Sequence, residues 1–293
     1  LSSFIDLIPI PRCLNFALWS DPGYFTASFS DIIKAQGGAV RLANFMYGSY
    51  TGLSWTMFML IPSFTAMFGR SALPQIAGAW TLGNRKEFER KVTVVLRSNF
   101  VIGFPLYLGL SAMSRQILEF LFSGRQQEVT VSATSLFILG LGGVFLTLSS
   151  TFISIFQVIG RSDLPVKLML PGCAVKLIFN VFTISVPAIN INGAAVSTVI
   201  MYAAVALGGY FALENVTGID FHIIRRMAAP LSAGLVCAVV SRIVYGFVRE
   251  SVNAVTALFL PIASGGAVYI ILLIIFNEIN IKSLLNRQKR KKF

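Results

Sequence analysis

Long apolar runs without charged residues constrain the fold of this chain more than any other feature of the sequence. The run of residues 131–159, for example, carries no Asp, Glu, Lys or Arg. A run of about 20 apolar residues is long enough to cross the hydrocarbon core of a bilayer as a helix. Only 12% of the 293 residues are charged and 55% are hydrophobic, whereas soluble domains carry about 25% charged residues. The pattern predicts an all-α integral membrane protein.

About eight such runs are predicted to be transmembrane helices. Most connections between them are short, which favours antiparallel packing of helices that are neighbours in the sequence. The predicted spans are residues 1–18, 42–68, 92–113, 131–159, 166–186, 193–213, 227–247 and 252–276.

The Lys and Arg residues give the chain a net charge of +12, but they do not form the aromatic-containing basic patch of a nucleic-acid-binding protein. Outside the spans, fifteen lie on the side of the C-terminal tail and five on the other side. Cytoplasmic loops are enriched in Lys and Arg, so this bias predicts a cytoplasmic C-terminus. The tail KSLLNRQKRKKF is expected to contact anionic membrane lipids.

Motifs that carry catalysis or bind cofactors are absent from the sequence. It contains no GxxxxGK[ST], HExxH or CxxC pattern, and no nucleophile elbow. The cysteines Cys13, Cys173 and Cys237 are widely spaced in apolar surroundings, which predicts neither a disulfide framework nor a metal site. We therefore expect no enzymatic activity, no metal and no cofactor.

Two local patterns predict details of packing. Gly48 and Gly52 form a GxxxG pair, and Gly140, Gly142 and Gly143 crowd one predicted span, so both groups are expected at close helix contacts. The segment NRKEFERK mixes both charge signs at helical spacing, which predicts a short separate helix at the cytoplasmic surface.

Ionisable residues inside the predicted spans are the candidate functional residues, because a charge at mid-bilayer costs about 2.5–3.5 kcal/mol on insertion scales. Lys176 lies nine residues beyond Lys167, and therefore about 13 Å deeper along a helix. It either lines a polar cavity for an anionic substrate or pairs with a carboxylate on another helix. Asp6 and Arg12 share the first span on different faces, and could belong to the same cavity or be ordinary ion-pair partners.

Several segments, in order, resemble a known family. They are SSFIDLIPIPRCL near the start, the long segment YGSYTGLSWTMFMLIPSFTAMFGRSALPQIAGAWTLGNRKEFERK, then ISIFQVIGRSDLPVKLMLPGCAVKLIFN and ININGAAVSTVIMY. The last two are similar to the patterns Q-x-x-G-R…P…K-L-x-x-N and I-x-G-A-A-x-S-T. The resemblance is to the polysaccharide-biosynthesis and stage V sporulation protein B family. Its members are relatives of the lipid II flippase MurJ in the multidrug/oligosaccharidyl-lipid/polysaccharide exporter superfamily.

The resemblance implies a two-lobed, alternating-access transporter of lipid-linked sugars or peptidoglycan precursors in the bacterial cytoplasmic membrane. Residues 1–213 would be the C-terminal six-helix lobe, residues 214–276 two additional helices, and residues 277–293 a basic cytoplasmic tail. The chain begins at Leu1 without an initiator Met, which we interpret as the start of a fragment that lacks the N-terminal lobe. Such a fragment is expected to be inactive alone in a flipping assay.

For such a cargo, basic groups in a hydrated cavity would hold the pyrophosphate while the polyprenyl chain stays in lipid. Arg12 and Lys176 are the candidates for these contacts, and Asp6 for an ion-pair or gating charge. Cell-envelope synthesis proteins are possible partners. Two alternatives stay open, namely a drug or cation exporter of the same superfamily and a membrane scaffold of an envelope-synthesis complex that transports nothing.

Replacing Lys176 with Met tests the cavity hypothesis. If the ammonium holds negative charge in a water-filled cleft, K176M in a full-length protein should be expressed and inserted normally but transport more slowly. The measurement is the transport rate at equal amounts of inserted protein. An unchanged rate would favour the ion pair over the substrate contact.

Overall fold

The computed structural model describes residues 6–70, 72–250 and 252–276, with the side chains of 39–40 and 66–70 excepted. Within these ranges every regular element is helical, as the sequence predicts. The helices are α2 (Pro9–Ser20), α3 (Pro22–Gln36), α4 (Ala39–Ser49), the π-helix η1 (Tyr50–Trp55), α5 (Thr56–Arg70), α6 (Leu73–Thr81), α7 (Arg85–Ala112), α8 (Ser114–Leu121), α9 (Gln126–Val158), α10 (Asp163–Ile184), α11 (Asn192–Thr217), α12 (Ile223–Val248) and α13 (Ala254–Ile275).

Six of these helices are long and apolar enough to cross a membrane, and they confirm six of the predicted spans. They are α7, α9, α10, α11, α12 and α13, with lengths from 22 to 33 residues. Their apolar side chains face the neighbouring helices on one side and are exposed on the other, where residues such as Phe182 and Leu207 point outward. In a bilayer, lipid rather than water would contact these exposed faces.

The first two predicted spans differ from the other six. Residues 1–5 of the first span lie outside the described residues, and the helix α2 that follows has 12 residues, too few to cross a bilayer alone. The second span is divided into α4, η1 and α5, with 11, 6 and 15 residues. Tyr50 and Thr56, at the two junctions, keep helical backbone angles, so the helical course continues through the π-helix. Hydropathy alone does not show such an interruption.

The separate surface helix predicted for NRKEFERK is wrong. These residues form the cap and first turns of α7, which continues without a break into the membrane span. The side-chain oxygen of Asn84 accepts a hydrogen bond of 3.1 Å from the backbone N–H of Glu87 and caps the helix. Glu87 in the first turn pairs with Arg90 and Lys91, which stabilises the charged end of the helix.

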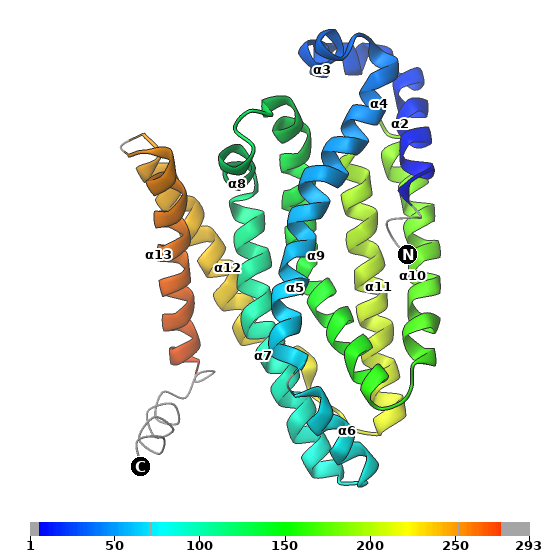
Figure 1. Cartoon of the computed structure of the whole chain (residues 1–293), viewed down its shortest axis with the longest axis vertical. Helices are drawn as coiled ribbons and strands as arrows, with labels where there is room; N and C mark the ends of the chain where they lie inside the picture. Colours follow the sequence, from blue (N-terminus) through cyan, green and yellow to red (C-terminus); the bar gives the residue numbers. More distant parts are fainter. Residues whose placement is uncertain (1–5, 71, 251, 277–293) are drawn as a thin grey trace.

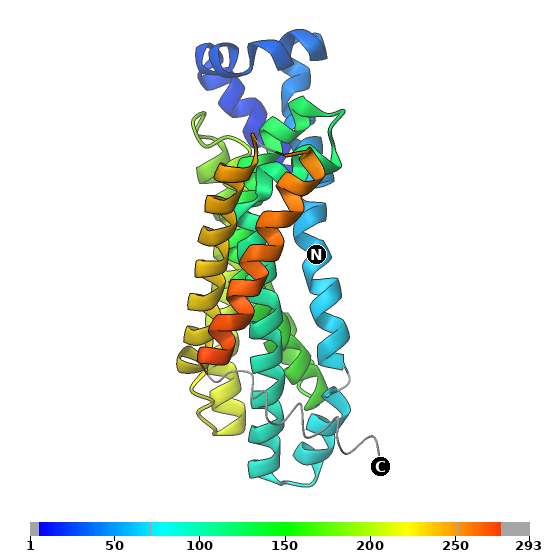
Figure 2. The ribbon, with the colours of Figure 1, turned by 90° about the vertical axis from the view of Figure 1, so that its left-hand side faces the viewer.

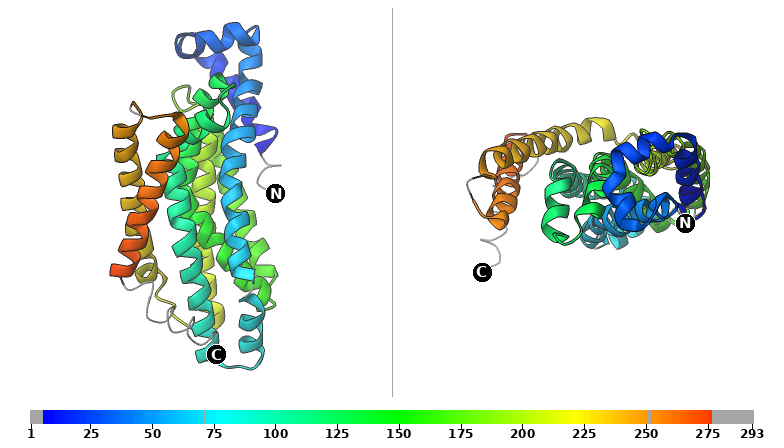
Figure 3. Two further views of the ribbon diagram at one scale, coloured as in Figure 1. Left: turned by 60° about the vertical axis from the view of Figure 1, so that its left-hand side comes forward. Right: turned by 90° about the horizontal axis from the view of Figure 1, so that it is seen from above.

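The long helices stand side by side, with α9 in the middle of the bundle (Figure 1). α9 packs against α7 on one side and α11 on the other, and α10 packs against α11. α12 and α13 form a pair that joins the bundle through contacts of α12 with α7, and Figure 2 shows this pair from its outer side. α2, α3 and α4 lie at the opposite end of the elongated outline, as the view from above in Figure 3 shows.

Successive connections alternate between the two ends of the bundle, and the basic residues gather at one of them. The end with α6 carries the connections from α5 to α7, from α9 to α10 and from α11 to α12. Basic residues described there are Arg85, Lys86, Arg90, Lys91, Arg161, Lys167, Arg225 and Arg226. The end with α3 and α8 carries Lys34, Arg41, Arg115, Arg125 and Arg249.

Glycines in α9 allow its close approach to both neighbours. A Cβ placed on Gly140 would lie 2.8 Å from the backbone of Ser111 in α7, and one on Gly143 would lie 2.1 Å from the ring of Tyr107. A Cβ on Gly142 would lie 2.2 Å from Val199 in α11. These three positions confirm the predicted close packing. In a bilayer, such van der Waals contact is a main source of helix association.

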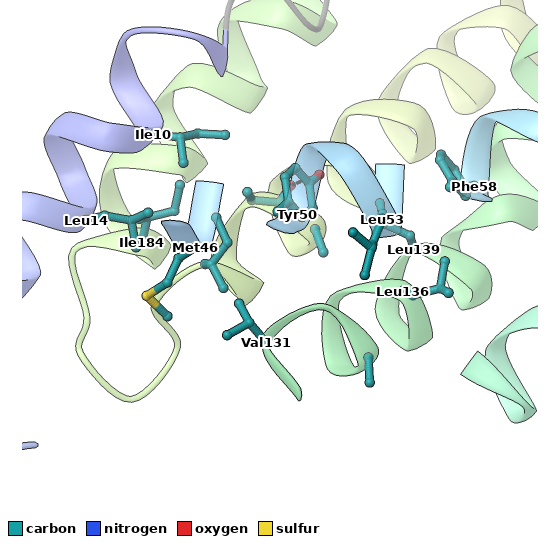
Figure 4. Packing of buried hydrophobic residues seen from close by; sticks show 14 of the residues in the cluster. Ile10, Leu14, Met46, Tyr50, Leu53, Phe58, Val131, Leu136, Leu139 and Ile184 are labelled. Carbon is teal, nitrogen blue, oxygen red and sulfur yellow. Dashed lines mark hydrogen bonds between the residues drawn. The ribbon is translucent and has the colours of Figure 1, made fainter. Parts of the chain in front are cut away.

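The GxxxG pair of Gly48 and Gly52 does not form a comparable contact. A Cβ at either position would meet no atom of the described residues within 4 Å. The helix containing this pair instead contacts the bundle through larger side chains, and Figure 4 shows Met46, Tyr50 and Leu53 in a cluster with residues of α2, α9 and α10. The prediction of close packing at Gly48 and Gly52 is therefore wrong for this arrangement.

Substituting Gly140 with Ala tests the contact between α7 and α9. The added methyl group would collide with backbone atoms of Ser111, which cannot turn aside as a side chain can. We expect a loss of about 1–3 kcal/mol of stability, as for other overpacked sites. The measurement is thermal unfolding of the purified protein in detergent. The matched control is Gly48→Ala, where there is space for the methyl group and stability should not fall; equal losses in both variants would contradict the contact.

Candidate functional site

Lys176 lies in the apolar helix α10, and its side chain is completely buried. α10 begins with Asp163 in its first turn, where a negative charge is favourable, and Lys167 forms an i,i+4 ion pair of 2.9 Å with it. Beyond that turn the helix is apolar except for Lys176, Asn180 and Thr183. The ammonium group therefore depends on other segments for its partners.

The partner of Lys176 is Asp6, which precedes α2. The Lys176 Nζ and Asp6 Oδ2 atoms are 2.5 Å apart, and the carboxylate is almost as deeply buried as the ammonium. Asn180 lies one turn after Lys176 on the same face of α10. Its Nδ2 donates a hydrogen bond of 3.1 Å to the second carboxylate oxygen, Oδ1. Both oxygens of Asp6 are thus occupied by donors from α10.

Two further elements complete the surroundings of the pair. In α11, the Ser197 hydroxyl donates a short hydrogen bond to Oδ1 of Asn180, which fixes the orientation of the amide. The indole ring of Trp55, the last residue of η1, lies with its centroid 5.4 Å from Lys176 Nζ, a cation–π distance. Next to it, Tyr50 of the same π-helix donates a hydrogen bond of 3.4 Å to the Ala194 carbonyl oxygen in α11. The pair therefore joins the segment before α2 to α10, α11 and η1.

Burial makes this arrangement strongly dependent on both charges. An isolated charge in an apolar interior is very unfavourable, and removing one partner of a buried pair costs about 3–5 kcal/mol. Because Lys176 and Asp6 compensate each other, the site as a whole carries no net charge. The pair holds Asp6, and with it the start of the described chain, against α10.

Of the predicted site residues, the structure brings Asp6 and Lys176 together and leaves Arg12 apart. Arg12 is exposed on α2, and its side chain forms no ion pair or hydrogen bond with the residues described. The geometry at Lys176 is that of the second alternative, an ion pair with a carboxylate from another segment. The assignment of Lys176 and Arg12 as substrate contacts stays a prediction.

Asn180, Ser197 and Trp55 were not identified as candidates from the sequence. A signal existed for Asn180, since its spacing of four residues from Lys176 places both on one helix face. For Ser197 and Trp55 there was none, because hydroxyl and indole groups are frequent in apolar helices and only their tertiary positions bring them to the charge.

Within the described ranges, no group of three His, Cys, Asp or Glu residues could hold a metal ion.

Comparison with known proteins adds independent information. The sequence model of the family described as "Lipid II flippase MurJ" matches residues 39–265. The lipid II flippase MurJ of Bacillus subtilis is 23% identical over 221 residues, which are 72% of this chain and 40% of that protein. An uncharacterized membrane protein of Methanocaldococcus jannaschii is 28% identical over 153 residues, 52% of this chain and 29% of that protein.

A solved structure of a lipid II flippase MurJ in an inward closed conformation has a similar fold. The TM-score is 0.63 at 17% identity, and the similarity covers 80% of this chain and 47% of that one. The chain thus spans less than half of the length of each of these relatives.

A double-mutant cycle tests the ion pair. Asp6→Asn leaves the ammonium without a carboxylate, and Lys176→Met leaves the carboxylate without an ammonium, so each should lower the stability by about 3–5 kcal/mol. With the ion pair in place, K176M is therefore no longer expected to be expressed and inserted as the wild type is. The double variant has neither buried charge and should be more stable than either single variant. The measurement is thermal unfolding in detergent. If the effects of the two substitutions simply add, the two side chains are not coupled.

Proposed function

Since this chain belongs to the lipid II flippase MurJ family, we propose that it moves a lipid-linked saccharide or peptidoglycan precursor across the cytoplasmic membrane. The observation that carries the proposal is the family match to residues 39–265, which extends from the first residue of α4 into α13. The family consists of transporters rather than enzymes, and the chain is a multi-pass membrane protein. The similar fold of the solved flippase supports the same conclusion.

The packing of the helices supports the proposed division of the chain into a lobe, two additional helices and a tail. Residues 1–213 would form a six-helix lobe, 214–276 the added pair and 277–293 a cytoplasmic tail. α12 and α13 pack as a pair on α7, in agreement with an addition to a lobe. Because α11 extends to Thr217, the proposed boundary at residue 213 falls within its last turn. The lobe would alternate access together with a second lobe, as in transporters whose bundles rock around a central site.

The basic end of the bundle supports an orientation in the membrane. Positively charged loops are retained on the cytoplasmic side. All connections rich in Lys and Arg lie at the end with α6, where α13 also ends. We therefore propose that this end, like the basic tail that follows α13 in the sequence, faces the cytoplasm of a bacterial cell.

The buried ion pair suggests how the head group of the cargo would act on the helices. Arg12 is exposed on α2, six residues after Asp6, and would attract the pyrophosphate. Lys176 would then exchange the carboxylate of Asp6 for a phosphate oxygen, which releases the segment before α2 from α10. Such an exchange replaces one anion by another, so the ammonium remains compensated throughout the movement. Asp6 is then the gating charge.

A cation exporter fits this site less well. The carboxylate that could attract a cationic cargo is already neutralised by Lys176 and is buried. A scaffold without transport would need neither Arg12 nor an exchangeable pair.

Envelope-synthesis proteins are proposed as neighbours in the membrane, because they would make the cargo on one side and use it on the other.

Arg12→Gln is the variant that tests the proposed function. Arg12 has no side-chain partner among the described residues, so the substitution should leave the amount of folded protein unchanged. Loss of one charge-assisted contact to phosphate should lower transport about tenfold. The measurement, in cells that carry the substitution in the native gene, is the fraction of lipid-linked saccharide reached by a membrane-impermeant reagent.

Arg125→Gln is the matched control, because it removes the same charge from an exposed residue at the start of α9. It should not change the accessible fraction. If deletion of the whole gene leaves the accessible fraction unchanged but disperses the synthesis proteins, the chain is a scaffold and the transport proposal is wrong.

A further inference from the structure

A cavity of about 470 Å³ lies between α7, α8, α9 and α12, at the end of the bundle opposite the basic connections. Its volume is in the range of sites that bind small molecules. It is separate from the Lys176 pair, because none of the residues around that pair lines it. Several apolar residues of its wall are exposed, among them Phe137, Leu235 and Val239, so the cavity opens at the lipid-facing surface.

The wall changes from polar to apolar along the helix axes. In α9 the lining residues include Thr130 near the start of the helix, then Thr134, Phe137 and finally Leu141 deeper in the bundle. In α12, Arg242 lies six residues before the end of the helix, and Leu235 lies two turns deeper. A molecule that fills this cavity must therefore have a polar part near the helix ends and an apolar part toward the bilayer centre.

The polar end of the cavity is positively charged. Arg115 and Arg242 line it, and none of the described residues in its wall is acidic. Arg242 forms no ion pair or side-chain hydrogen bond with any residue in the described part of the chain. Arg115 pairs with Glu119 at 2.8 Å, but its side chain is largely exposed, and such surface pairs contribute little. The Arg242 guanidinium is available for the bidentate contact that arginine makes with phosphate, and Arg115 can add a contact through the donors that Glu119 does not occupy.

Gln116 supplies an independent indication of a ligand. Only 9% of this residue is exposed, it lines the cavity, and its Oε1 atom has no hydrogen-bond partner among the described residues. A buried polar atom without a partner costs about 1–3 kcal/mol. Because Gln116 lines the cavity, the NH₂ group of its amide is a donor that an anion there can use. An amide and two guanidinium groups thus line the same largely apolar cavity.

We propose that this cavity binds an anionic phospholipid, with its phosphate at Arg242, Arg115 and Gln116 and an acyl chain along the apolar wall. The ligand is a component of the surrounding bilayer and is distinct from the transported cargo. Its place between α12 and the helices α7, α8 and α9 lets the lipid bridge the added helix pair and the six-helix bundle. The proposal does not depend on the proposed function.

The test uses the purified 293-residue chain, stripped of lipid in detergent, with phosphatidylglycerol and phosphatidylcholine of identical acyl chains. Native mass spectrometry measures how much of each lipid remains bound. We expect phosphatidylglycerol to be retained more strongly, and Arg242→Gln to weaken its binding about tenfold, which is the effect of losing one charge-assisted contact. The matched control Arg41→Gln removes an exposed arginine at the same end of the bundle but outside the cavity, and should not change binding.

A second variant tests the cavity without changing its charge. Ala238 lines the cavity, and Ala238→Phe should fill part of it and reduce the retention of phosphatidylglycerol while Arg242 is intact. Size-exclusion profiles of both variants show whether they are folded. If Arg242→Gln does not fold, the result with Ala238→Phe decides.

Three results would overturn the proposal. Equal binding to the wild-type chain and both cavity variants would mean that Arg242 only reaches toward head groups, as arginines near helix ends commonly do. Equal losses in Arg242→Gln and Arg41→Gln would indicate nonspecific charge attraction. Binding of inorganic phosphate or a polyprenyl phosphate that depends on Arg242, without retention of phosphatidylglycerol, would assign the site to a free anion or to the cargo.

Discussion

In a hydrocarbon environment, every backbone polar group and every charge needs a partner within the protein, and the whole structure depends on this constraint. It explains why the described regular elements are all helical, since a helix satisfies its own backbone. It also explains the surroundings of Lys176, where a carboxylate, an amide and an indole ring compensate one ammonium. The buried pair therefore acts as a specific connection between segments far apart in the sequence.

Polar contacts between the long helices follow from the same constraint. Ser54 donates to the Ser132 carbonyl oxygen at 2.8 Å, and the Ser132 hydroxyl donates to the Ser49 carbonyl oxygen at 2.9 Å, so two hydrogen bonds join η1 and α4 to α9. Tyr269 joins α13 to α7 by a bond of 2.7 Å to the Val101 carbonyl oxygen. Together with the glycine contacts of α9, these bonds fix which helices are neighbours. Apolar faces alone would not, because lipid contacts them equally well.

The two charged sites differ in a way that suits different ligands. The Lys176 site is buried, compensated and surrounded by four segments, so a ligand there must displace Asp6 and thereby move helices. The cavity at Arg242 is open to the bilayer, carries uncompensated charge and has an apolar wall, so a lipid can enter it without moving the bundle. The first arrangement suits the exchange that we propose for transport, and the second suits the lipid that we propose between α12 and the helices α7, α8 and α9.

The sequence by itself determined the helical fold and the six spans that meet the length and hydropathy criteria, because the bilayer requires long uncharged runs that are visible in composition. It also identified Lys176 as exceptional, and the spacing to Asn180 was present in it. Only the tertiary structure decided that Asp6 is the partner of Lys176, that Gly140 and Gly143 rather than Gly48 lie at close contacts, and that α7 includes the charged segment before it. The first two features depend on distances between segments that are remote in sequence, and a hydropathy pattern carries no information about which helix faces meet. The third is local, but the hydropathy of α7 changes at the point where its helical course continues.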